Sequence, residues 1–201
     1  MRLFVAFDLP DIVRHGLADL TKKLKPLCKN ARWARPEGMH VTLKFIGHVI
    51  DEADTRKLDS LCAALAAVRS DVPVEMHFRG VGFFPDAHRP RVLWCGVKGC
   101  ANLAMLAAGV QDALEPLGIP RDEHEFVPHL TLARFNKLSP VEKFRSSREG
   151  FDELARSVAE LPQNDFGSVR ESEFHLFESL LKPTGAEYKK IQTYSFVKES
   201  A

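Results

Sequence analysis

Two copies of one short motif contain the residues of this sequence best suited to acid–base chemistry. The segments His40-Val-Thr-Leu43 and His129-Leu-Thr-Leu132 each place a histidine two positions before a threonine. With 8 histidines in 201 residues, a shuffled chain would contain roughly 0.03 such matches, so two copies indicate a shared role. A common core-strand pattern does not explain them, because histidine suits an apolar layer poorly.

The spacing within each motif brings its polar side chains together. Residues two apart on a strand point to the same face, so His40 and Thr42 project side by side, about 6.6 Å apart at a rise of ~3.3 Å per residue. The same holds for His129 and Thr131, while the apolar residues between them face the opposite way. Two such pairs, brought together, would surround a small anion with two imidazoles and two hydroxyls.

These groups are the ones that phosphodiester hydrolysis requires. A base takes a proton from the attacking water, and an acid protonates the departing oxygen on the other side of phosphorus. Histidine serves in either role near neutral pH, and threonine hydroxyls stabilise the charge that gathers on the non-bridging oxygens. We therefore predict four catalytic residues, the acid–base pair His40 and His129 together with Thr42 and Thr131.

Two cations close to the motifs are candidate substrate-binding residues. On an unbroken strand Lys44 shares the face of Thr42 and lies near substrate phosphates, although a solvated lysine at a strand end is the alternative. Arg134 is out of phase with His129, so a strand twist or a bulge would have to bring it to that face.

Other residues gave weaker signals. His124 and His129 lie five apart, but no cysteine or carboxylate completes a ligand set, so we expect no metal and no cofactor. Trp33 and Trp94 are aromatic surfaces on which a base could stack, and core packing is the favoured interpretation of both.

Composition limits the class of protein. The chain is 45% hydrophobic with a formal net charge of +1. This near-zero charge excludes binding of long nucleic-acid duplexes through overall positive charge, but not a local basic site. The N-terminal apolar run meets Asp8 and Pro10 before it reaches signal-peptide length, so we expect no export. The four cysteines form no C-x-x-C pair, and no apolar run is long enough to span a membrane. We expect a cytoplasmic protein with reduced cysteines, not bound to a membrane and monomeric.

Hydrophobic periodicity predicts an order of strand, helix and histidine strand that occurs twice. Ser139-Pro-Val-Glu resembles a capping box, and Asp51 is a candidate N-cap. The predicted strands are 3–7, 40–46, 74–84, 91–97, 129–135, 169–180 and 188–197, and the predicted helices are 11–27, 51–68, 101–117 and 140–161.

The two halves resemble copies of each other. A shift of 89 positions superposes Arg2 on Arg91, Leu17 on Leu106 and the first histidine motif on the second, without a gap. We predict one α+β domain over 1–201, with two pseudo-symmetric lobes of mostly antiparallel sheet and outer helices around a central cleft. The strand 74–84 is expected to close the first lobe, with the lobe junction near 85–90.

The paired motifs resemble the 2H phosphoesterase superfamily. The flanks Arg32-Trp-Ala-Arg-Pro-Glu-Gly-Met-His40, Phe84-Pro through Arg89-Pro-Arg-Val-Leu-Trp94, Pro128-His-Leu-Thr-Leu-Ala-Arg134 and Leu176-Phe-Glu-Ser are similar to its RNA 2′,3′-cyclic phosphodiesterase branch, historically called 2′-5′ RNA ligase.

The resemblance implies opening of a 2′,3′-cyclic phosphate at an RNA end to a 2′-phosphate, with 2′-5′ ligation as the reverse reaction. It also implies that His40 donates and His129 accepts the proton, and it places an arginine at the position of Arg134. Two alternatives stay open. One is the same chemistry on another cyclic nucleotide, and the other is a non-catalytic module that binds an RNA end or a nucleotide.

Overall fold

The computed structural model describes residues 1–29, 31–48, 55–135, 146–161, 165–182 and 185–197. Its strands are β1 (Arg2–Phe7), β2 (Arg32–Trp33), β3 (Val41–His48), β4 (Val74–Phe84), β5 (Val92–Gly99), β6 (His129–Arg134), β7 (Asp165–Glu171), β8 (Glu173–Lys182) and β9 (Gly185–Ser195). Its helices are α1 (Asp11–Leu24), α2 (Thr55–Ala66), α3 (Ala101–Leu114) and α4 (Ser146–Glu160), with short 3₁₀ turns at Lys25–Leu27, Pro36–Gly38 and Glu115–Leu117.

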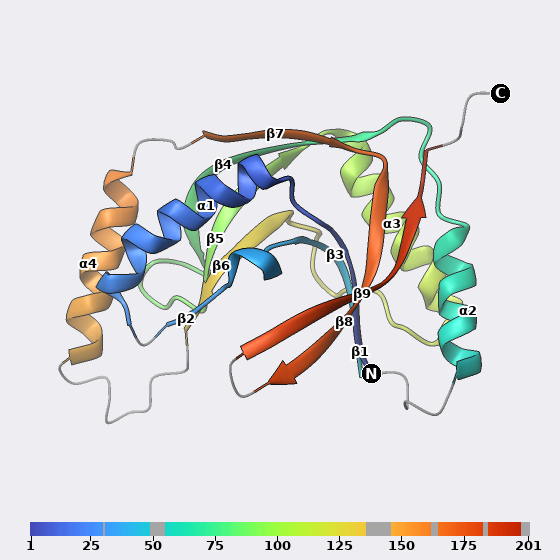
Figure 1. Cartoon of the computed structure of the whole chain (residues 1–201), viewed down its shortest axis with the longest axis horizontal. Helices are drawn as coiled ribbons and strands as arrows, with labels where there is room; N and C mark the ends of the chain where they lie inside the picture. The colour runs from blue at the N-terminus through green and yellow to red at the C-terminus, as the bar shows by residue number, and fades with distance from the viewer. Residues whose placement is uncertain (30, 49–54, 136–145, 162–164, 183–184, 198–201) are drawn as a thin grey trace.

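The strands form one curled sheet, in the order β7-β4-β5-β6-β3-β1-β8-β9, with β2 beside β6 (Figure 1). The described strand pairings within this sheet are antiparallel. We call β1, β3, β8 and β9 the first lobe, and β4, β5, β6 and β7 the second lobe. Read outward from the centre, β3-β1-β8-β9 mirrors β6-β5-β4-β7, so the predicted α+β fold with two pseudo-symmetric lobes is confirmed.

The lobes meet where Val41 pairs with Leu130. These two residues are 89 positions apart, which is the shift that superposes the histidine motifs. The pseudo-twofold axis of the sheet therefore passes through this pair. The neighbouring strands β1 and β5 are related by a shift that is one residue smaller. Ala6 of β1 lies opposite Thr42, and Trp94 of β5 lies opposite Thr131.

The helices pack on one face of the sheet and enclose the main hydrophobic core. Helix α1 follows a strand of the first lobe but packs on β7 of the second, and α3 follows β5 but reaches β3 of the first. In Figure 1, α1 and α4 lie toward one end of the molecule and α2 and α3 toward the other. Each lobe thus contributes a helix that packs on a strand of the other lobe, and these contacts connect the two lobes.

Three features of the predicted organisation are wrong. Strand β4 pairs with β5 and β7, so it belongs to the second lobe and not to the first. The segment 85–91 consequently joins two neighbouring strands of one lobe, and the chain crosses between lobes before β4. The single strand predicted over 169–180 is two strands, because the chain turns at Ser172 and β7 and β8 pair at opposite ends of the sheet. Asp51 and the capping box at Ser139 lie outside the described residues.

Matching bulges interrupt the two histidine strands. Two consecutive residues of β1 pair with Thr42 and Lys44, and two consecutive residues of β5 pair with Thr131 and Ala133. Leu43 and Leu132 are therefore the extra residues of the two bulges. An extra residue reverses the alternation of faces beyond it. Two consecutive side chains are consequently buried in each strand.

The bulge in β3 places a lysine in the core. Lys44 is 3% exposed, and its Nζ donates to the carbonyl oxygen of Pro120 at 2.8 Å and to Oδ1 of Asp122 at 2.6 Å. The prediction that Lys44 shares the face of Thr42 is therefore wrong. Lys44 would share the face of Thr42 only on an unbroken strand, and the bulge interrupts that alternation.

We expect Asp122→Ala to lower the free energy of unfolding by about 1–2 kcal/mol, because it leaves a buried ammonium with one acceptor while Asp122 itself is half exposed. Lys44→Met should cost less, because it removes the charge that needs the partner. Urea unfolding of both variants measures the difference. A larger loss in Lys44→Met than in Asp122→Ala would contradict this account.

Candidate active site

The four motif side chains share one face of the sheet, which we call the motif face. Val41 and Leu130 are fully buried in the core. Because successive side chains on a strand alternate between faces, their neighbours point away from the core. Extending the register of the Val41–Leu130 pair by one residue sets His40 opposite Thr131 and Thr42 opposite His129. The structure therefore brings the two motifs together.

This arrangement sets the scale of the site. Directly opposite residues of an antiparallel pair have Cβ atoms about 5 Å apart, and diagonal neighbours about 7–8 Å apart. The two histidines are diagonal neighbours, with a threonine across from each. That spacing leaves room for one phosphate group between two imidazoles and two hydroxyls.

Each histidine is oriented by the same backbone contact. Nδ1 of His40 lies 2.7 Å from the carbonyl oxygen of Gly38, and Nδ1 of His129 lies 2.8 Å from that of Val127. A carbonyl oxygen only accepts, so Nδ1 carries the hydrogen in both rings. Nε2 of each neutral ring is then left as the acceptor. The two carbonyls are themselves 89 positions apart, so the pseudo-symmetry extends to the tautomer.

The surroundings of His40 are aromatic. Its ring centre lies 4.7 Å from that of Phe4 and 5.0 Å from that of Tyr188, which meets it edge-on. Burial, together with the nearby positive charge of Arg134, lowers the pKa of His40 from 6.5 to about 4, although the Gly38 carbonyl opposes this shift. His40 is consequently neutral at pH 7 in the substrate-free protein.

The surroundings of His129 differ. Its ring meets Phe84 edge-on at 5.1 Å, and Phe84 packs on Trp94 at the same centroid distance. The indole ring of Trp94 lies directly over Gly82, where any Cβ would overlap it. The lobes thus share their backbone pattern but not the rings that pack around the two imidazoles.

The two tryptophans have separate positions. Trp33 donates from Nε1 to the carbonyl oxygen of Cys28 and packs against the main core, as the favoured interpretation predicted. Trp94 is half-buried and lies opposite Thr131. Trp94 therefore lies on the motif face, beside Thr131.

The bulge in β6 brings Arg134 to the motif face. Leu132 and Ala133 are both buried, and Arg134 beyond them is exposed. The positive charge of Arg134 is one of the causes that lower the pKa of His40. The bulge that sequence analysis required for this placement is present.

Sequence analysis missed two aromatic residues close to the site. Phe45 occupies in the first lobe the position of Arg134 in the second, and the shift of 89 already aligned the two. Tyr188 reaches His40 from β9, which is 148 positions further along the chain, and no local pattern signals such a contact.

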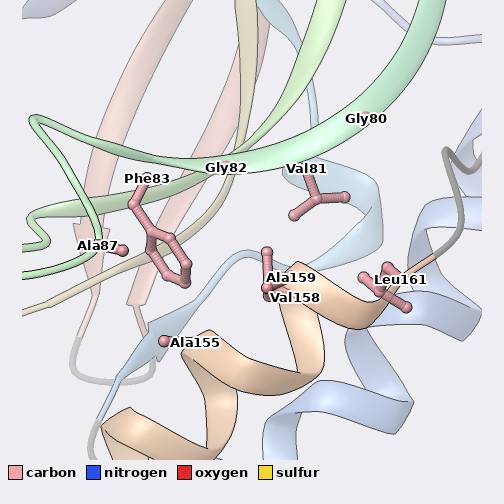
Figure 2. A pocket seen from close by; sticks show the side chains of 9 residues that line it. All are labelled: Gly80, Val81, Gly82, Phe83, Ala87, Ala155, Val158, Ala159 and Leu161. Atoms are coloured by element: carbon pink, nitrogen blue, oxygen red, sulfur yellow. The ribbon is translucent and has the colours of Figure 1, made fainter.

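A cavity of about 430 Å³ lies elsewhere, between β4 and α4 (Figure 2). Val81 and Phe83 point from the strand toward Ala155 and Val158 of the helix, and the described residues of its lining carry no titratable side chain. This cavity faces the core side of β4, because Val81 pairs with the buried Cys95.

The described segments contain neither a metal-binding cluster nor a membrane-spanning helix. No group of three or more histidine, cysteine, aspartate or glutamate side chains in these segments is arranged to hold a metal ion. In the same part of the chain, none of the helices combines the length and the apolar character needed to cross a membrane.

Comparison with known proteins gives consistent results. The family model of the 2'-5' RNA ligase superfamily matches residues 10–164. An RNA 2',3'-cyclic phosphodiesterase of Archaeoglobus fulgidus is 34% identical over 194 residues, which covers 96% of this chain and 99% of that protein. Its counterpart in Methanothermobacter thermautotrophicus is 30% identical, covering 96% and 98%.

Solved structures agree on the fold. A protein of Thermus thermophilus superposes with a TM-score of 0.74 at 29% identity and covers all of both chains. The apo form of E. coli LigT superposes with a TM-score of 0.72 at 22% identity over 98% of each chain. With the family model matched over most of its length, this chain belongs to the 2'-5' RNA ligase superfamily.

Proposed function

We propose that this protein opens 2′,3′-cyclic phosphates at RNA ends to 2′-phosphates, by metal-independent acid–base catalysis with His40 and His129. One observation carries the proposal. Two imidazoles related by the pseudo-twofold axis lie on one face, and in each the Nδ1–H faces a backbone carbonyl oxygen, which leaves Nε2 as the proton acceptor of the neutral ring. The names of these two relatives, RNA 2',3'-cyclic phosphodiesterases that are matched over nearly their whole length, support the choice of substrate.

In the proposed step, the cyclic phosphate lies between the two Nε2 atoms. His129 takes a proton from a water molecule as the water oxygen bonds to phosphorus, and the bond from phosphorus to O3′ breaks on the far side. His40 gives its proton to O3′, which leaves a 3′-hydroxyl and a 2′-phosphate. The hydroxyls of Thr42 and Thr131 donate hydrogen bonds to the non-bridging oxygens.

The low pKa of His40 bears on its role as proton donor. A neutral imidazole cannot donate from Nε2 while Nδ1 holds the hydrogen bond to Gly38. An anionic phosphate near Nε2 offsets the charge of Arg134 and favours the protonated ring, so binding of substrate raises the pKa of His40. The donor is therefore charged in the complex and neutral in the free protein.

Arg134 is the proposed phosphate-binding cation of the site. Its exposed guanidinium near His40 can donate two hydrogen bonds to phosphate oxygens, which a buried lysine on the other face cannot do. Lys44 has no part in the proposal. The same groups can run the reaction backward as 2′-5′ ligation, with the two histidines exchanging roles, and a small cyclic nucleotide also satisfies the site.

We expect His40→Ala and His129→Ala each to lower kcat by roughly 10²- to 10⁴-fold or more, because each removes one half of the acid–base pair. The assay is turnover of adenosine 2′,3′-cyclic phosphate in excess EDTA, with separation of the 2′- and 3′-phosphate products. His124→Ala is the matched control. Wild-type turnover that stops in EDTA, or full activity in both variants, would refute the mechanism.

The pH profile reports the environment of His40. Activity requires one protonated and one neutral histidine, so kcat/KM falls on the acid side when both rings hold protons. The pKa of His40 is lowered to about 4, so in the free protein His40 becomes protonated only near that pH, well below the ordinary 6.5. Both rings therefore hold protons together only near pH 4 or below. We expect substantial kcat/KM at pH 5, measured with a correction for any unfolding. An acid limb centred near pH 6.5 would contradict this environment.

Arg134→Met should lower kcat/KM by roughly 10²-fold, because it removes hydrogen bonds to charge that develops on the phosphate. It should also move the acid limb toward higher pH, since the guanidinium is one cause of the low pKa of His40. Arg170→Met, an exposed arginine on β7 at the edge of the sheet, is the control. Equal effects of the two substitutions would exclude a specific role for Arg134.

A further inference from the structure

The carbonyl oxygen of Gly38, which orients His40, ends a short turn. This 3₁₀ turn spans Pro36–Gly38, and the N–H of Met39 after it donates to the carbonyl oxygen of Pro36 at 3.2 Å. A single turn of this kind has little stability of its own, because its few hydrogen bonds have poor geometry. The orientation of His40 therefore depends on the contacts that hold the turn in place.

One guanidinium connects this turn to the end of β1. Arg14 of α1 donates from Nη1 to the carbonyl oxygen of Pro36 at 2.7 Å. From Nη2 it donates to the carbonyl oxygen of Leu9 and to Oδ1 of Asp8, both at 2.8 Å. The side chain is only 17% exposed, so these bonds are largely shielded from water. A rigid planar group thus joins the turn to the segment between β1 and α1.

The acceptor at the other end of this bridge is a charged group beside His40. Extending the register of the Phe7–Val41 pair by one residue sets Asp8 next to His40. Burial alone would raise the pKa of Asp8, but its hydrogen bonds, first among them the one from Arg14, lower that pKa. Asp8 is consequently ionised at neutral pH and anchors the guanidinium through a charge-assisted bond.

The second lobe has no arginine at the corresponding position. A shift of 89 positions superposes Arg14 on Leu103, which is buried and apolar. Helix α3, which carries Leu103, contains neither arginine nor lysine. His129 receives its carbonyl contact from Val127, in a lobe without this arginine. The pseudo-symmetry therefore makes His129 an internal control for His40.

We propose that Arg14 is a positioning residue for His40, acting through the turn Pro36–Gly38 and not on the substrate. This inference rests on the acid role of His40 proposed above. Nδ1 holds a hydrogen in both the neutral and the protonated ring, so a fixed Gly38 carbonyl keeps the ring in one orientation throughout the reaction. Without the bridge to the turn, this carbonyl is released, and the neutral ring can adopt the Nε2–H tautomer.

The test compares the tautomers of the two motif histidines with the kinetics of the same variants. Arg14→Met removes the donors, and Arg14→Lys keeps a charge beside Asp8 without the planar fork. Arg156→Met, at an exposed arginine of α4, is the control. The ¹⁵N and ¹³Cδ2 chemical shifts of each ring distinguish Nδ1–H from Nε2–H at pH 8, above the ordinary pKa of histidine. Turnover of adenosine 2′,3′-cyclic phosphate gives kcat and KM, and urea unfolding verifies that each variant is folded.

We expect both Arg14 variants to shift His40 toward the Nε2–H tautomer while His129 keeps Nδ1–H. In the same variants kcat should fall roughly 10- to 100-fold with KM little changed, because Arg14 does not contact the substrate. If Arg14→Met does not fold, Arg14→Lys decides. A tautomer of His40 and a kcat equal to those of the wild type, or equal changes in both histidines, would overturn the positioning role. A wild type that does not open the substrate would overturn the proposed function, and the tautomers would still decide whether Arg14 fixes His40.

Discussion

The pairing of Val41 with Leu130 is the constraint on which the rest of the structure depends. It is the pair through which β3 and β6 join the two lobes, and both side chains are fully buried. Burial of such side chains contributes about 1.5–3 kcal/mol each, and a slip of one residue would exchange them for histidine and threonine in the core. Hydrophobic burial on one face thereby fixes the positions of four polar side chains on the other.

The two bulges are a second constraint, and they have unequal consequences. In β6 the extra residue buries Ala133, which needs no partner, and returns Arg134 to the motif face. In β3 the same event buries Lys44, whose charge must then be paired with Asp122. One backbone irregularity, repeated by duplication, thus supplies a cation to the site in one lobe and an ion pair to the core in the other.

Local periodicity was sufficient to predict most helices and strands, and the predicted limits of β4 agree with the structure. It was not sufficient where pairing decides the outcome. The division between β7 and β8 at Ser172 has no glycine or proline to signal it, and it appears only because the two strands pair at opposite ends of the sheet. The assignment of β4 to the second lobe has the same origin, since sequence order does not specify which strands are neighbours.

The candidate site was predictable to a similar extent. The repeated motif identified both histidines and both threonines, because a fixed spacing on one strand determines a shared face. The position of Lys44 was wrong because ideal alternation cannot anticipate a bulge. The contact of Tyr188 with His40 depends on a hairpin far along the chain, and Gly38 allows it, since a Cβ there would lie 3.1 Å from the tyrosine ring.

The proposed reaction uses one histidine as the acid and the other as the base, so a pseudo-symmetric scaffold would need different surroundings for its two imidazoles. Identical carbonyl contacts fix the same tautomer in both rings, so the backbone does not distinguish acid from base. The side chains around the two rings differ. Phe4 and Tyr188 pack on His40, and burial together with the charge of Arg134 lowers its pKa, whereas Phe84 lies beside His129. The pseudo-symmetric backbone thus gives both imidazoles the same orientation, and the neighbouring residues give them different surroundings.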